Sequence, residues 1–306
     1  MKKIFIDGSA GTTGLRIYER LSKRKDLSLI ILPEETRKDI NARKQAINSS
    51  DVAILCLPDS ASIEAVSLVE NPNTVIIDTS TAHRTNNDWT YGFPELYEDK
   101  NVVSTSKRIA NPGCHASGFI AIVYPLVKKG LLKKDAKLTC FSLTGYSGGG
   151  KKMIEEYESE DRINLLDAPR QYGITQSHKH LPEMKKVCGL DIEPIFCPIV
   201  ADFKCGMEVS VPIFMDEING SLDDVKKVYK DFYKGNLVRY SDDDEGGFLS
   251  SNAFSGKDCM EITANGNENR IVITARFDNL GKGASGAAIQ NMNLVLGKSE
   301  DYELEV

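Results

Sequence analysis

The chain has 306 residues, of which 41% are hydrophobic and 27% charged, and its formal net charge is −6. This composition is typical of a folded globular protein, and the length suffices for two domains with substantial cores. The negative charge and the lack of a basic stripe argue against nucleic acid and anionic membrane surfaces as main partners. No apolar run has the length of a membrane span, and the first residues show no secretory hydrophobic region.

The seven cysteines predict a reducing, cytoplasmic location. Their number is odd, most have apolar neighbours, and none belongs to a Cys-x-x-Cys pair. This usage is typical of free thiols and differs from that of a disulfide framework.

The first residues predict a strand, a glycine turn and a helix. Residues 3–7 have an apolar, β-prone centre at 4–6, and the stretch 15–23 has a helical pattern. Three glycines between them favour a tight turn and a close approach of the backbone to a phosphate. This variant of the dinucleotide fingerprint is formed by Gly8, Ser9, Ala10, Gly11, Thr12, Thr13 and Gly14.

The second predicted strand, residues 27–32, is expected to end near the ribose of the adenosine. Glu34 and Glu35 would suit the 2′-hydroxyl of NAD, whereas Arg37 and Lys38 would suit the 2′-phosphate of NADP. The residues themselves leave this choice open.

Two more strands are predicted at residues 51–57 and 74–78, and helical stretches separate them. Alternating strands and helices predict a doubly wound parallel sheet of the Rossmann type, with ligands at the carboxyl ends of the strands. The polar pairs Pro58-Asp59 and Thr79-Ser80 follow these strands and fit that edge.

A tight turn in residues 111–118 delivers one cysteine to the start of an apolar segment. Pro112 and Gly113 favour the turn, and Cys114 follows directly. If the apolar segment is a helix, its N-terminal N–H groups and dipole favour a Cys114 thiolate, which is a strong nucleophile. The alternative is a small buried cysteine.

A predicted strand at 137–143 precedes Gly145, which is followed after four residues by Gly150-Lys151. The spacing approaches that of a P-loop, but Lys152 stands where a magnesium-binding Ser or Thr is needed. We expect a flexible anion-accepting loop that enters a helix at Met153.

His178 and His180 are two residues apart and would share one face of an extended segment. With Cys114 they would offer three zinc ligands, but no further ligand stands at metal-binding spacing. A surface or core role is a second alternative. The interpretation that we favour is a histidine acting as general acid and base beside Cys114.

The second half of the chain predicts an α+β domain with a mainly antiparallel sheet. Ser221 is expected to cap an amphipathic helix, and the acidic stretch 242–247 to be a solvated loop. A last helix is expected at 287–296. The predicted strands are residues 195–200, 207–214, 259–263 and 270–275, the last two joined by a turn at 264–269.

Seven motifs make the chain similar to the N-acetyl-γ-glutamyl-phosphate reductase family in its shorter form, and they follow the family's order over nearly the whole chain. The motifs are the glycine turn at 8–14, Asp78–Arg84, Tyr91–Leu96, Asn111–Cys114, Tyr146–Lys151, His178–Glu183, and Lys282–Gly286 with Gln290–Asn293.

The resemblance implies two domains. Residues 1–113 plus 283–306 would form the dinucleotide-binding domain, and residues 114–282 an inserted α+β domain for substrate binding, catalysis and dimerisation. It further implies NADPH as cofactor, an acyl phosphate of arginine biosynthesis as substrate, and a homodimer or homotetramer built on the sheet of the second domain.

The resemblance also implies the site residues. Cys114 would be the nucleophile, and His180, or else His178, the acid and base. The backbone N–H of Cys114 and the side chain of Asn111 are candidate oxyanion donors. Where the family often has an aromatic residue after the cysteine, this chain has His115, which either touches substrate or faces away. The cofactor would be held by residues 8–14, Ser80 and Gly283, and the substrate by Arg84, Arg108, Asn111, Ser147 and Glu183.

Three other functions remain open. A dinucleotide-sensing regulatory protein would have the same first domain without chemistry. Aspartate-semialdehyde dehydrogenase and N-acetyl-aminoadipyl-phosphate reductase share the cysteine and the two-domain plan, and differ in the pocket around the amino group of the substrate.

Overall fold

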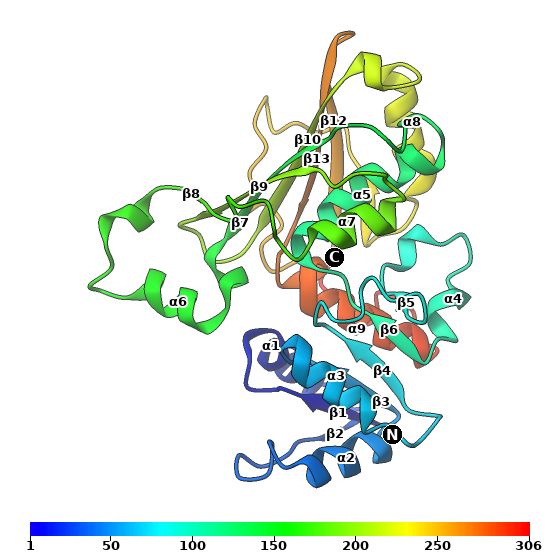
Figure 1. Ribbon diagram of the computed structural model, residues 1–306, viewed down its shortest axis with the longest axis vertical. Coiled ribbons are helices and arrows are strands. Elements are labelled where there is room, and N and C mark those ends of the chain that lie inside the picture. Colours follow the sequence, from blue (N-terminus) through cyan, green and yellow to red (C-terminus); the bar gives the residue numbers. More distant parts are fainter. The chain divides into compact units, whose positions relative to one another are not determined.

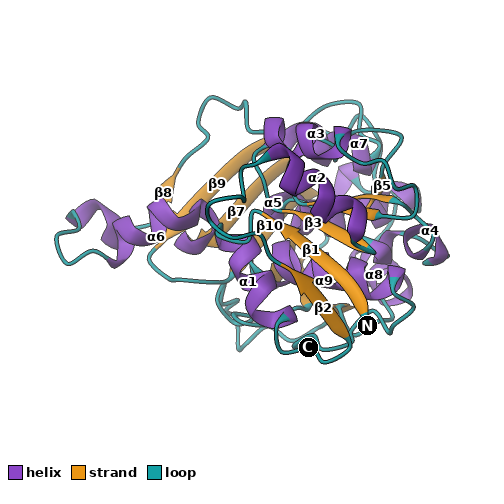
Figure 2. Ribbon diagram, turned by 90° about the horizontal axis from the view of Figure 1, so that it is seen from below, coloured by secondary structure: helices purple, strands orange, loops and turns teal.

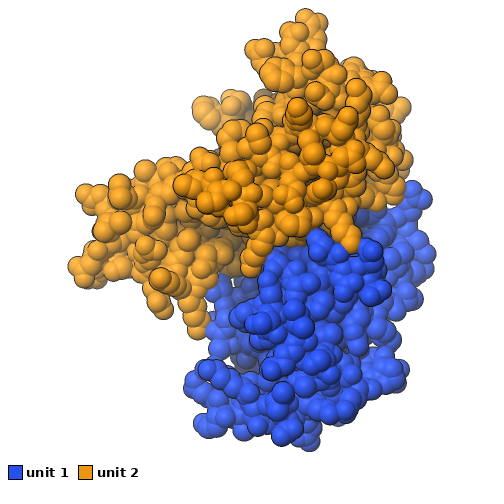
Figure 3. Space-filling view, in the orientation of Figure 1, with its two compact units in different colours: residues 1–112, 284–304 blue, residues 113–283, 305–306 orange.

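The computed structural model describes all residues from 1 to 306. The chain forms two compact units, which Figure 3 colours separately. Unit 1 consists of residues 1–112 and 284–304, and unit 2 of residues 113–283 and 305–306. Each unit is built on a sheet of its own, as Figure 1 shows.

Unit 1 contains a six-stranded sheet in the order β2-β1-β3-β4-β6-β5, and all its strands are parallel. The prediction of a doubly wound parallel sheet is confirmed. The elements are β1 (Lys2–Asp7), α1 (Thr12–Leu21), β2 (Leu27–Ile30), α2 (Ile40–Ser49), β3 (Val52–Leu55), α3 (Asp59–Ser67), β4 (Val75–Asp78), β5 (Thr90–Tyr91), α4 (Asn101–Ser104), β6 (Arg108–Ala110) and α9 (Gly286–Val295).

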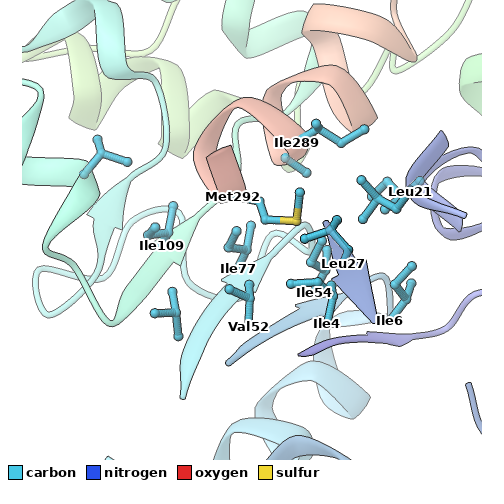
Figure 4. Close-up of a cluster of buried hydrophobic side chains, with 14 residues drawn as sticks. Ile4, Ile6, Leu21, Leu27, Val52, Ile54, Ile77, Ile109, Ile289 and Met292 are labelled. Carbon is cyan, nitrogen blue, oxygen red and sulfur yellow. The ribbon is translucent and has the colours of Figure 1, made fainter. Parts of the chain in front are cut away.

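Alternation along the buried strands of unit 1 gives the sheet an apolar surface on both faces. In β1, Ile4 and Ile6 point to one face and Phe5 to the other. Figure 4 shows the first face, where Leu21 of α1 and Met292 of α9 pack against the isoleucines. Helices α2 and α3 cover the second face through their buried alanines and Ile47. Because both faces are covered, the ligand edge lies at the carboxyl ends of the strands.

Unit 2 contains a seven-stranded mixed sheet in the order β11-β12-β13-β10-β7-β9-β8, with four antiparallel and two parallel pairings. The expected α+β character is therefore present. The elements are α5 (Cys114–Lys128), β7 (Thr139–Gly145), α6 (Gly150–Glu158), β8 (Arg170–Gln171), α7 (Leu181–Cys188), β9 (Ile195–Ala201), β10 (Met207–Phe214), α8 (Leu222–Phe232), β11 (Val238–Tyr240), β12 (Met260–Gly266) and β13 (Arg270–Phe277).

Helix α5 lies directly on the sheet of unit 2. A Cβ atom at Gly118 would come within 2.5 Å of Val209 Cγ2 on β10, so only glycine permits this approach. Helix α8 packs beside α5, and the buried hydroxyl of Tyr229 donates a hydrogen bond of 2.7 Å to the carbonyl of Ile122. The predicted cap at Ser221 is a full capping box. These contacts fix the helix that begins at the candidate nucleophile.

The opposite face of this sheet exposes apolar side chains. Along β10, Val209 and Val211 are buried under the helices, whereas Phe214 points the other way and is exposed. Phe141 on β7 and Val272 on β13 are exposed on the same side. We call the residues Phe141, Phe214 and Val272 with Ile195 the open face of unit 2.

The segment around α6 differs from its prediction. A short 3₁₀ turn covers Tyr146–Gly149, and α6 begins at Gly150, three residues before the expected start at Met153. Gly150 has φ +77°, a backbone conformation that favours glycine. The segment is therefore an ordered turn into a helix and not an open loop. Figures 1 and 2 show α6 extending away from the sheet of unit 2.

The acidic stretch 242–247 is exposed throughout, as expected, and it also contacts the sheet. Glu245 forms an ion pair with Arg276, which is buried on β13 and also pairs with Glu261 at 3.0 Å. A buried guanidinium requires such partners, so this loop neutralises a charge of the sheet.

Candidate active site

Cys114 is the first residue of α5, and it is half-buried. Gly113 precedes the helix in an extended conformation, and its carbonyl accepts the first helical hydrogen bond from the Ser117 N–H at 2.8 Å. The N–H groups of a first helical turn have no acceptor within the helix, and they carry the positive end of the dipole. The predicted placement of Cys114 is confirmed, and it favours the thiolate form.

Two other residues hold the turn that carries Cys114. Glu183 on α7 is 1% exposed, and its Oε1 accepts a hydrogen bond of 2.9 Å from the Gly113 N–H. A Cβ atom at Gly283 would lie 3.1 Å from Cys114 Cβ. Glu183 was expected to bind substrate and Gly283 cofactor. Those two roles stay predictions, and the contacts place both residues beside the cysteine turn.

His178 and His180 lie together, with ring centroids 4.8 Å apart. The segment is a turn and not an extended strand, since His180 is the residue before α7 and its N–H donates to His178 Nδ1 at 3.2 Å. Burial lowers the pKa of His178, and the charge of Lys179 adds to this effect. A histidine of lowered pKa is a base at neutral pH.

The ring of His115 lies 5.5 Å from that of His180 and 5.9 Å from that of His178. It is 4% exposed, and burial lowers its pKa to about 3. Its Nδ1 is 2.6 Å from Ser142 Oγ, and its Nε2 is 2.6 Å from the hydroxyl of Tyr172. His115 therefore faces inward, into a hydrogen-bonded interior.

Tyr172 completes this cluster of ring side chains. Burial raises the pKa of its hydroxyl, and negative charge on Cys114 raises it further, so the two groups are electrostatically coupled. Sequence reasoning missed Tyr172 and Ser142. Neither motif spacing nor a turn signal marks them, because Ser142 lies on β7, Tyr172 follows β8, and the two meet only through His115.

The glycine turn of unit 1 has the form that the fingerprint predicts. Gly8 has φ +86°, and a Cβ atom there would lie 2.3 Å from the carbonyl oxygen of Cys56. A Cβ atom at Gly14 would lie 2.3 Å from the Gly8 carbonyl oxygen. Gly11 precedes α1, which begins at Thr12 and whose first N–H groups have no acceptor within the helix. The turn can hold a phosphate because side chains are excluded from it.

A cleft of about 320 Å³ lies beside this turn, within unit 1. Its lining includes the backbone of residues 8–11 together with Arg37 and Lys38. Glu34 lies outside the lining and forms an exposed ion pair of 2.8 Å with Arg37. Of the two sets of residues that the sequence left open, the cationic set borders the cleft.

Ser80 lies at the carboxyl end of β4, the edge where a cofactor is expected. Its Oγ donates a hydrogen bond of 2.8 Å to Asp78, a carboxylate with no exposed surface. His83 binds the same carboxylate through Nδ1 at 2.6 Å and stacks on Trp89 at 4.0 Å. Asp78 thus orders the polar loop after β4.

Arg84 and Asn111 are bonded to each other in unit 1. Arg84 Nε donates to the Asn111 carbonyl at 2.9 Å, and another of its nitrogens donates to the Thr79 carbonyl at 2.8 Å. The amide nitrogen of Asn111 donates to the Ala284 carbonyl at 3.1 Å. This bond uses one of the two amide hydrogens and orders the turn, and the expected role of Asn111 as an oxyanion donor stays a prediction.

Two further expected substrate residues are Arg108 in unit 1 and Ser147 in unit 2. Arg108 is the first residue of β6, at the amino end of a parallel strand, and it donates to the Thr74 carbonyl at 3.2 Å. Ser147 is buried and accepts a hydrogen bond of 3.0 Å from Asn279. Arg108 thus lies at the edge opposite the carboxyl ends of the strands, and the Ser147 hydroxyl is already hydrogen-bonded; their substrate-binding roles stay predictions.

Two family models match the chain. Residues 3–103 match the NAD binding domain of semialdehyde dehydrogenases, and residues 114–279 match their dimerisation domain. The second match identifies the chain as one that forms homo-oligomers. None of its helices combines the length and the apolar character that a membrane span requires.

Relatives and solved structures agree with these matches. An N-acetyl-gamma-glutamyl-phosphate reductase of Brucella ovis is 45% identical over 97% of this chain and 99% of its own length. N-acetyl-gamma-glutamyl-phosphate reductase 2 of Nostoc sp. is 41% identical over 99% of both chains. The aspartate semialdehyde dehydrogenase of Francisella tularensis shares the fold, with a TM-score of 0.73 at 15% identity over 97% of this chain and 100% of that one. The identities and their coverage confirm the resemblance inferred from the motifs: the chain belongs to the N-acetyl-γ-glutamyl-phosphate reductase family.

Proposed function

We propose that this chain catalyses the NADPH-dependent conversion of N-acetyl-glutamyl 5-phosphate to N-acetyl-glutamate 5-semialdehyde and phosphate, a step of arginine biosynthesis. The observation that carries the proposal is the position of Cys114, on the first turn of α5 in a unit whose interior gathers three imidazoles. The family to which the chain belongs supports the choice of substrate.

The residues of unit 1 fit a dinucleotide. The glycine turn excludes side chains, and the adjoining cleft offers the first N–H groups of a helix to a pyrophosphate. Arg37 and Lys38 would bind a 2′-phosphate, and this supports NADPH over NADH. Ser80 would contact the cofactor at the carboxyl end of β4. When bound, the cofactor supplies the hydride of the reaction.

The first step is acyl transfer to Cys114. The thiolate attacks the γ-carbonyl of the acyl phosphate, a C–S bond forms, and the C–O bond to phosphate breaks. Phosphate leaves with the electron pair of that bond. The N–H groups of the first turn of α5 would stabilise the oxyanion that forms on the way, and Glu183 would hold the turn in place through Gly113.

The second step reduces the thioester and releases the aldehyde. Once hydride has reached the carbonyl carbon, the oxygen carries negative charge, and His180 would donate a proton to it. The same imidazole then accepts that proton while the C–S bond breaks, which returns Cys114 to the thiolate. His178 is the alternative donor. Arg84 is the candidate for binding a carboxylate of the substrate, because its planar guanidinium suits two oxygens.

The domain roles follow from this mechanism. Residues 1–113 plus 283–306 would bind the cofactor, and residues 114–282 would bind substrate, carry the catalytic groups and form a homodimer or homotetramer through the open face. The cysteine usage supports action in the cytoplasm.

The reverse reaction tests the proposal. Purified protein is mixed with NADP⁺, phosphate and one of three aldehydes: N-acetyl-glutamate 5-semialdehyde, the N-acetyl-aminoadipate semialdehyde, or aspartate semialdehyde. We expect the highest kcat/KM with the first, read as absorbance of the reduced nicotinamide. The Cys114→Ser variant should bind NADPH normally and lose nearly all turnover. A preference for another aldehyde, or near-normal activity of this variant, would overturn the proposal.

A further inference from the structure

A chain of three hydrogen-bonded side chains runs through the interior of unit 2. Ser142 of β7, His115 of α5 and Tyr172, which follows β8, are joined by two contacts of 2.6 Å at the two ring nitrogens of His115. His115 directly follows Cys114 in the first turn of the helix. Both nitrogens of the ring are therefore occupied, and the ring cannot rotate without breaking both bonds.

The His115 ring stays neutral in this environment. Burial and the neighbouring His178 lower its pKa to about 3, far below the range in which the enzyme works. A neutral imidazole carries one proton, so one nitrogen donates and the other accepts. At any moment the His115 ring therefore donates to one of the two hydroxyls, of Ser142 or Tyr172, and accepts from the other.

The His115 ring packs against the imidazoles of His178 and His180. His180 is inclined to it at 52°, and His178 stands nearly perpendicular at 80°. Phe196 closes the cluster, with its ring 5.3 Å from that of His115. Aromatic rings at such distances and angles are in edge-to-face contact, which restricts their rotation.

The segment that supplies Tyr172 is itself anchored. The Tyr172 N–H donates to the Pro198 carbonyl at 3.0 Å. Four residues later, the Gln176 amide donates to the Phe196 carbonyl at 2.8 Å and accepts from its N–H at 2.9 Å. These bonds attach the segment between β8 and α7 to β9, so the phenol reaches His115 from a rigid support.

We propose that Ser142, His115 and Tyr172 act together as positioning residues, which lock a neutral imidazole against His178 and His180 and so fix the orientation of the catalytic acid. The proposal rests on the proposed function for its kinetic test only. In this proposal none of the three residues touches the reacting atoms. Their effect passes through the histidine pair.

The physical reason is the sensitivity of proton transfer to geometry. A general acid must lie within hydrogen-bond reach of the oxygen that it protonates, and a displacement of about 1 Å can cost about 10²-fold in rate. A third imidazole that carried charge would also repel a proton from its neighbours. A neutral and immobile ring avoids both effects.

Nitrogen-15 NMR of the imidazoles tests the lock without any substrate. The chain has only four histidines, so single substitutions assign every signal. We expect His115 in the wild-type protein to show one neutral tautomer from pH 5 to pH 8. In Tyr172→Phe and Ser142→Ala, which each remove one bond, we expect a mixture of tautomers. Titration of His115 within this pH range in the wild-type protein would overturn the proposal, whatever the enzyme's substrate.

Kinetics of the same variants test the consequence. We expect Tyr172→Phe to lower kcat about tenfold or more with little change in KM, and to alter the pH profile of kcat. The matched control is Tyr240→Phe, which removes from β11 of the same unit a tyrosine hydroxyl that donates to Asp242 at 2.9 Å. It should lower the melting temperature and leave kcat and the pH profile unchanged. If the wild type and Tyr172→Phe have equal kcat values and pH profiles, the three residues have only a structural role and the proposal fails.

Discussion

At the scale of single residues, the two neighbouring imidazoles have unequal environments. His180 is buried at the start of α7, whereas His178 is half-buried beside Lys179. The buried ring is better shielded from water, and proton transfer in a dry site is more effective. This difference favours His180 as the acid.

We therefore predict that His180→Asn lowers kcat by about 10²-fold or more, the usual scale of acid–base catalysis. His178→Asn should have a smaller effect. Both variants should bind NADPH as the wild type does, which fluorescence titration of the cofactor would check. A large loss that is confined to His178→Asn would reverse the assignment.

The sequence was sufficient to locate Cys114, because a Pro-Gly turn before an apolar run places a side chain at a helix start whatever the surroundings. It could not locate Tyr172, since the contact between Tyr172 and His115 depends on how the segment after β8 and helix α5 are arranged in space. Arg108 shows the same limit. This residue stands shortly before the motif Asn111–Cys114, but the direction of β6 decides which edge of the sheet it reaches.

At the scale of elements, the segment of β1, the glycine turn and α1 shows how much of the fold a local sequence pattern can predict. Glycine spacing predicted the turn, and apolar runs predicted the four longest strands of the sheet. The two-residue strand β5 has too little periodicity to be recognised. The start of α6 was misplaced because Gly150 reads as part of a loop, although its positive φ serves the turn into a helix.

The segment between β2 and α2 supports a prediction on cofactor choice. Replacing both Arg37 and Lys38 by alanine should raise KM for NADPH about tenfold or more, because charge-assisted bonds to a phosphate are lost. KM for NADH, which lacks that phosphate, should change little. Lys44→Ala is the control, since Lys44 carries similar charge on α2 but pairs with Glu70 and lies outside the cleft. Equal losses with both cofactors would exclude recognition of the 2′-phosphate by this pair.

At the scale of the whole molecule, the open face of unit 2 presents the apolar surface that an oligomer needs. Phe141 is 46% exposed in the middle strand region of the sheet, and Phe214 and Val272 lie on the same side. Such a surface is costly in water unless a partner covers it. The match to a dimerisation domain concerns this unit.

We predict that Phe141→Asp shifts the protein toward monomer, because a carboxylate would lose its hydration within an apolar interface. Analytical ultracentrifugation over a range of concentrations measures the shift. Phe248→Asp serves as the control, since Phe248 is 77% exposed in the loop after residues 242–247. An unchanged oligomer in Phe141→Asp would place the interface elsewhere.

The position of α9 has a consequence for synthesis on the ribosome. This helix supplies Ala288, Ile289 and Met292 to the core of unit 1, yet it is encoded after nearly all of unit 2. During translation, one apolar face of the sheet of unit 1 stays uncovered until residues almost two hundred positions further along the chain have been made. Unit 2 carries nearly all its own residues by then. The later-encoded domain can thus mature first, and the domain translated first reaches its native packing only as translation ends.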